Sequence, residues 1–155
     1  MRKHPIIAYV RELLRGTCGQ SLVETAMAVS LCSVLMLGAA EFGRLTYAGI
    51  EISDSARAGV EYGSQSLPTA SDLPNMRIAA GLSAPDISNL TLTASSYCKC
   101  ADGTSSTCAT SDCAGSRIIT YVQVVTSGSI DPLIYVPGLP KSYALTGKAV
   151  MRVVD

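Results

Sequence analysis

The feature that most constrains this chain is an uncharged apolar run close to its beginning. Residues 25–40 (TAMAVSLCSVLMLGAA) carry no charged side chain, and the run is extended on its two sides by Leu22, Val23, Phe42 and Leu45. A helix needs about 20 mostly apolar residues to cross the hydrocarbon core of a bilayer. The run therefore predicts a membrane-spanning helix, and the alternative interpretation is a buried helix of a soluble protein.

The charges before and after this run predict the orientation of the span. Residues 1–19 contain four basic side chains and one acidic side chain, whereas the remainder of the chain has an acidic excess. Basic residues that precede a span are retained on the cytoplasmic side of the membrane. We therefore expect the N-terminus in the cytoplasm and the residues after about 45 on the other side.

The composition argues against catalysis and nucleic-acid binding. The chain has 12 Lys and Arg against 12 Asp and Glu, so it has no overall basic field of the kind that binds nucleic acid. Its single histidine is His4, which leaves no histidine-based triad and no multi-histidine metal site. We expect a protein that is not an enzyme and that uses no cofactor, metal or small-molecule substrate.

The apolar pattern continues beyond the span as one stripe of an amphipathic helix. Apolar or small side chains recur at steps of three and four residues, at Phe42, Leu45, Gly49, Ile52, Ala56, Val60 and Gly63. The pattern predicts one continuous helix over residues 20–63, about 66 Å long. A secretory signal ending at Gly38-Ala39-Ala40 is the competing interpretation, but cleavage there would cut this helix in two.

A short motif precedes the apolar run. In residues 19–24 (GQSLVE), Gly19 has no side chain to obstruct a peptidase, and Glu24 lies five positions later. Cleavage after Gly19 would create an α-ammonium group on Gln20, about 6 Å along the helix axis from Glu24. That amine would neutralise a carboxylate whose presence at membrane depth is costly; alternatively, Glu24 simply lies among the lipid headgroups.

This motif resembles the processing site of type IV pilin-like proteins. With the segments EFGRL at residues 41–45 and SARAGV at 55–60, the chain resembles more narrowly the TadE-like pseudopilins of the tight-adherence (Tad) pilus machinery. The resemblance covers roughly residues 19–62. It implies prepilin cleavage between Gly19 and Gln20, and a role for Glu24 in recognition and assembly.

The function that the resemblance implies is that of a minor pseudopilin, a membrane-anchored subunit that helps to initiate or assemble a Tad-type pilus. Its partners would be a prepilin peptidase, other pilins or pseudopilins, and an inner-membrane assembly platform. The chain would cross the inner membrane once, with its C-terminal domain in the periplasm or in a cell-surface pilus. The rival hypotheses are a pseudopilin of another type II-like secretion system and a secreted binding or adhesive domain.

Small residues on the predicted helix favour close packing of helices. Ala39 and Gly43 form a small-xxx-small pair, which lets two helices in lipid approach each other closely. Simple tolerance of small residues within a span explains the same pair equally well.

Beyond residue 63 the pattern predicts an α+β domain of pilin-like architecture, in which the long helix packs on a small antiparallel sheet. A short helix is expected over residues 71–80, with Ser71 as its N-cap and Gly81 at its end. Strands are expected at residues 87–97, 117–126 and 142–154, with the second of these in the centre. The predicted organisation is a cleaved cytoplasmic leader, the long helix and an extracytoplasmic domain, over residues 1–19, 20–63 and 64–155.

Four cysteines lie within a polar loop at residues 98–113 of this domain. Their spacing is C-x-C-x7-C-x4-C, which lacks the paired C-x2-C units of common zinc sites and favours two disulfides over zinc. Cys98 and Cys100 share one face of a predicted strand. We expect nested pairing, Cys98 with Cys113 and Cys100 with Cys108, from three possible connectivities.

Overall fold

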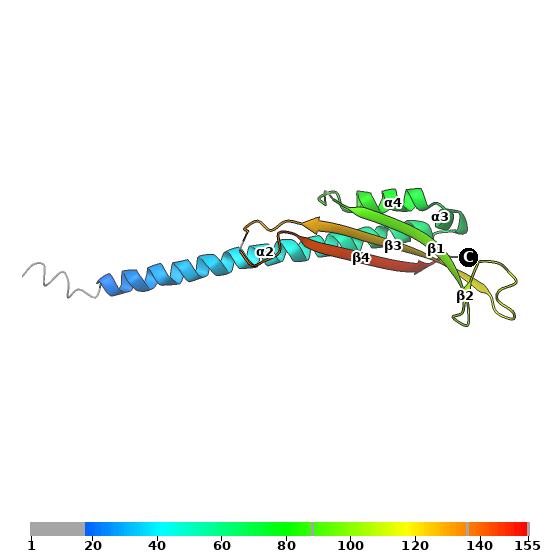
Figure 1. Cartoon of the computed structure of the whole chain (residues 1–155), viewed down its shortest axis with the longest axis horizontal. Helices are drawn as coiled ribbons and strands as arrows, with labels where there is room; N and C mark the ends of the chain where they lie inside the picture. Colours follow the sequence, from blue (N-terminus) through cyan, green and yellow to red (C-terminus); the bar gives the residue numbers. More distant parts are fainter. Residues whose placement is uncertain (1–17, 88, 136, 155) are drawn as a thin grey trace, which may run out of the picture. The chain divides into compact units, whose positions relative to one another are not determined.

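The computed structural model describes residues 18–87, 89–135 and 137–154 (Figure 1). It has the α+β fold expected from the sequence, in which a long N-terminal apolar helix packs against a four-stranded antiparallel sheet. The chain divides into two compact units, with the boundary between Phe42 and Gly43. Residues 1–17 of the predicted leader lie outside the described residues.

The long helix, α2, comprises Cys18–Ser64 and is continuous through residue 40, as the periodicity predicts. In the first unit its side chains from Gly19 to Ala40 are exposed. The hydroxyl groups of Thr25, Ser30 and Ser33 each donate a 2.8 Å hydrogen bond to the carbonyl four residues earlier. These polar groups are thus satisfied within the helix itself, as an apolar solvent requires.

The sheet consists of β1 (Thr91–Cys100), β2 (Ser105–Ser106), β3 (Ile118–Ile130) and β4 (Tyr143–Arg152), in the order β2-β1-β3-β4. All neighbouring strands are antiparallel, and β3 lies between β1 and β4 as predicted. The first strand begins four residues later than expected because residues 84–87 form turns after the preceding helix. The two-residue strand β2 was not predicted.

Two short helices, α3 (Leu67–Ser71) and α4 (Leu73–Leu82), replace the single helix expected over residues 71–80. The predicted N-cap Ser71 is wrong, because Ser71 is the last residue of α3 and Asp72 caps α4. The Asp72 carboxylate accepts a 3.3 Å hydrogen bond from the Asn75 backbone and a 2.7 Å bond from its side chain. These hydrogen bonds hold the pKa of Asp72 below its usual value, and the bond from the Asn75 side chain has the largest effect.

The core of the second unit lies between the sheet and the helices α2 and α4 (Figure 1). On α2 the predicted stripe is buried at Ile52, Ala56, Val60 and Gly63, whereas Phe42 at its beginning is exposed. Ala48 is the first buried position of the helix. The core is completed by Ala70, Met76, Ala80, Val122 and Val124 from the other helices and β3, and by Val153, which follows β4.

Strand β4 crosses the backbone of α2 at Gly147. A Cβ atom added to Gly147 would lie 2.6 Å from the carbonyl oxygen of Ile52 and 2.9 Å from the Cα of Ser53. Beside it, the buried Thr126 hydroxyl donates a 2.7 Å hydrogen bond to the same Ile52 carbonyl. Glycine is therefore required here by the close approach of two backbones.

Candidate functional site

The motif residues Gly19, Gln20 and Glu24 lie in the first two turns of α2. All three are exposed, and the space where a Gly19 side chain would lie is open. Gln20 and Glu24 are four positions apart and therefore share one helix face. In a chain cut after Gly19, the new amine would lie one helical turn from the Glu24 carboxylate.

The first unit presents an apolar surface on all sides of the helix. Within the described residues, Gly19–Ser64 is the one helix that is long and apolar enough to cross a membrane, and its apolar window is unburied. Such a helix has the length and composition of a membrane anchor or a signal sequence. Among the described residues of the first unit, the large exposed apolar side chains are Leu22, Val23, Met27, Val29, Leu31, Val34, Leu35, Met36, Leu37 and Phe42.

The predicted packing residues Ala39 and Gly43 are also exposed. Apart from the adjoining helix backbone, no atom of the described residues lies within 4 Å of the position that a Gly43 Cβ would occupy. The two residues are four positions apart on α2, so they leave a small-residue strip on its surface. Close approach of another helix at this strip stays a prediction.

The four cysteines of residues 98–113 form two disulfides, Cys98–Cys108 and Cys100–Cys113. The expectation of two disulfides is confirmed, but the nested pairing is wrong. Residues 101–104 turn the chain back along β1, so that Ser106 lies opposite Cys98 and brings Cys108 to it. Cys113 then reaches Cys100 where the chain returns to pair with β1 at the start of β3.

Asp112 organises the disulfide loop from within. Its carboxylate accepts hydrogen bonds from the Thr107 hydroxyl at 2.6 Å, the Thr107 backbone at 2.7 Å and the Ser106 hydroxyl at 3.2 Å. These hydrogen bonds lower the pKa of Asp112 from its ordinary value, and the bond from the Thr107 side chain has the largest effect. The loop is thus fixed by two covalent bonds and one carboxylate, and its disulfides indicate an extracytoplasmic domain.

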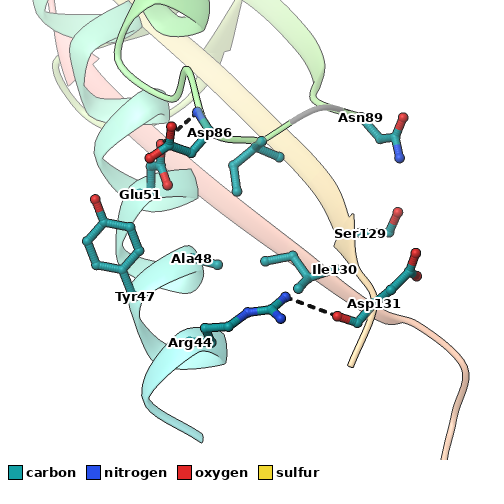
Figure 2. Close-up of a pocket in the computed structure, with 10 residues that line it drawn as sticks. Arg44, Tyr47, Ala48, Glu51, Asp86, Asn89, Ser129, Ile130 and Asp131 are labelled. Carbon is teal, nitrogen blue, oxygen red and sulfur yellow. Dashed lines mark hydrogen bonds between the residues drawn. The ribbon is translucent and has the colours of Figure 1, made fainter. Parts of the chain in front are cut away.

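A pocket of about 310 Å³ lies beside α2 in the second unit (Figure 2). Arg44 Nη2 donates a 3.0 Å hydrogen bond to the carbonyl of Asp131, and Glu51 Oε1 accepts a 3.3 Å bond from the Asp86 backbone. The other oxygen of Glu51 is buried and has no hydrogen-bond partner in the described residues. Two loops are therefore held against α2 by its own side chains.

Sequence reasoning did not predict this pocket. The available signal was the spacing of Arg44 and Glu51, which are seven residues apart and hence on one face of the helix. Their partners Asp86 and Asp131 come from distant loops and use backbone atoms, which no side-chain pattern reveals.

No protein-family model, curated protein or solved structure matches the chain. A long N-terminal apolar helix packed on a four-stranded antiparallel sheet, with two disulfides in the outer domain, is a pilin-like architecture.

Proposed function

We propose that the chain is a minor pseudopilin, a membrane-anchored subunit that helps to initiate or assemble a Tad-type pilus. The observation that carries this proposal is the placement of Gly19 and Glu24 at the start of α2, directly before an apolar surface that the chain leaves exposed. The resemblance to pilin-like proteins implies prepilin cleavage after Gly19, in the first turn of this membrane-length helix.

The proposed sequence of events follows from the chemistry of this helix. Basic residues keep the leader in the cytoplasm while the apolar part of α2 enters the inner membrane. Cleavage after Gly19 converts a neutral amide into a charged amine on Gln20, which pairs with Glu24 of a neighbouring subunit and sets the axial position of the two helices. The strip at Ala39 and Gly43 then allows α2 to pack closely in the filament or against the assembly platform.

The outer domain supports an extracytoplasmic role. Two disulfides stiffen a polar loop that has few apolar side chains of its own, and such bonds persist in oxidising compartments. The last part of α2 is built into the core of this domain through Ile52, Ala56 and Val60. One helix thus belongs both to the apolar segment and to the folded domain, as an assembly subunit needs.

A secreted binding domain is the second candidate, and the unit boundary favours it. Cleavage by a signal peptidase after Ala40 would remove most of the first unit and leave the second, which begins at Gly43 and has its own core. The secreted-domain hypothesis gives no role to Glu24 and requires a cut within the continuous helix α2. A pseudopilin of another type II-like secretion system would differ from the first proposal only in its partners.

The proposal is tested at Glu24 in cells that carry the whole pilus system. Glu24→Ala and Glu24→Gln should still be cut after Gly19. Because removal of a charge makes membrane insertion easier, a loss of assembly in these variants could not be attributed to poor membrane entry. Both should lose crosslinks to other pilin-like subunits and reduce pilus assembly, with Glu24→Asp intermediate. Gly19→Val should accumulate as the uncut precursor, which is the control for processing.

Normal assembly by Glu24→Gln would contradict the proposed charge pairing and leave Glu24 as an interfacial residue. If the mature mass of Gly19→Val equals that of the wild type, the prepilin cleavage site is wrong. Crosslinks to subunits of a secretion apparatus in place of pilus subunits would favour the related pseudopilin assignment.

A further inference from the structure

The loop that joins β3 to β4, residues 131–142, is unusually apolar for an exposed connection. Leu133, Ile134, Tyr135 and Leu139 are 64, 52, 58 and 54% exposed. Prolines at 132, 137 and 140 keep the segment out of the sheet. Large apolar side chains gathered on an exposed loop mark an interaction surface; we call this segment, without residue 136, the apolar loop.

The position of the apolar loop is fixed by α2. Its first residue, Asp131, accepts the hydrogen bond from Arg44 through its backbone carbonyl (Figure 2). Arg44 is the second residue after the apolar first unit, which ends at Phe42. Covalent continuity therefore brings the apolar loop close to the point where the chain leaves the apolar segment of α2.

The loop also carries the residue types that settle at a membrane–water interface. The Nζ atom of Lys141 lies 6.0 Å from the centre of the Tyr135 ring, over its face. Tyrosine is enriched at the headgroup level of membranes, where its ring is apolar and its hydroxyl stays hydrated. A lysine beside it extends its ammonium toward water or lipid phosphate.

We propose that the apolar loop inserts its side chains into the outward-facing leaflet of the bilayer that α2 crosses. It would give the outer domain a second membrane contact and hold it against the lipid surface before assembly. This inference rests on the membrane anchor of the proposed function. The occupant is the lipid surface because the loop is held beside the residues that emerge from the span.

The test uses the full chain in lipid vesicles and takes advantage of its lack of tryptophan. Tyr135→Trp places one fluorophore in the loop, and Leu31→Trp places one near the middle of the span. Lipids brominated along their acyl chains quench tryptophan that lies in the bilayer. We expect the fluorescence of both probes to be quenched. Quenching of Tyr135→Trp should be strongest when the bromines lie near the headgroups, and quenching of Leu31→Trp when they lie near the chain ends.

Tyr97→Trp is the matched control, since it makes the same exchange at a distant position. Tyr97 pairs with Tyr121, nine residues before the end of β3, and is therefore about 30 Å from the apolar loop. We expect its fluorescence to stay unquenched. Because both probes replace tyrosine by tryptophan, the affinity of tryptophan for interfaces is equal in the two variants.

Quenching of Leu31→Trp without quenching of Tyr135→Trp would overturn the loop inference and leave the membrane anchor intact. Absence of quenching in both would remove the anchor and the inference together. A Tyr135→Trp emission that shifts to the blue with rising protein-to-lipid ratio, without quenching by any brominated lipid, would assign the loop to contacts with a second copy and also overturn the proposal.

Discussion

Replacement of Gly147 by alanine is expected to destabilise the second unit because two backbones meet there. The added Cβ would lie 2.6 Å from the Ile52 carbonyl oxygen, where ordinary contacts begin at about 3.4 Å. The obstructing atoms belong to the helix backbone, so β4 must move away from α2. This movement also strains the 2.7 Å bond from Thr126 to Ile52. Overpacking of this kind costs roughly 1–3 kcal/mol, and rigid obstacles favour the upper half of that range.

The effect is measured by thermal unfolding of the full chain in detergent, followed by the near-ultraviolet circular dichroism of its tyrosines. A loss of about 2–3 kcal/mol should lower the Tm by roughly 6–15 °C for a unit of this size. Gly49→Ala is the matched control on α2, because apart from the adjoining helix backbone no atom of the described residues lies within 4 Å of its added Cβ. Greater helix propensity should leave its Tm unchanged or raise it. An unchanged Tm for Gly147→Ala would refute the close contact of β4 with α2.

Three further predictions concern the outer domain. Thr126→Val removes a buried hydroxyl that bonds the helix backbone, and should cost about 1–2 kcal/mol in the same unfolding assay; an unchanged Tm would argue against this bond. Replacement of both Cys100 and Cys113 by serine should lower stability by roughly 2–4 kcal/mol, and peptide mapping of the wild type should find Cys98 linked to Cys108. Because the folded-state pKa of Asp112 is lowered, its stabilising effect is present above the ordinary aspartate pKa and is lost as the pH falls through the lowered value. The protection of the loop amides against hydrogen exchange, measured relative to the exchange rate of an unprotected peptide at the same pH, should therefore fall on acidification below about pH 4, and less so in Asp112→Asn.

The long helix and the sheet could be predicted because their signals are local and periodic. The stripe at Ile52, Ala56 and Val60 repeats at helical spacing, and these residues are buried in the structure. The apolar character of β3 on both faces marked it as a central strand. In each case the pattern of side chains within one segment reflects the surface that the segment buries.

The disulfide pairing, the second short helix and the pocket could not be predicted in this way. The pairing depends on the turn at residues 101–104 and the two-residue strand β2, which is too short to show a period. The break between α3 and α4 depends on whether Ser71 or Asp72 caps the helix, and both are good capping residues. The pocket is closed by backbone atoms of loops that are distant in sequence.

The measurement that tests the proposed function most directly is the N-terminus of the mature chain, determined by mass spectrometry of the protein isolated from its own cells. The pseudopilin account predicts a chain that begins at Gln20, with the whole apolar part of α2 retained. A chain that begins at Glu41 would show release by signal peptidase and contradict the membrane-anchored assembly role. A chain that begins at Met1 would contradict prepilin processing.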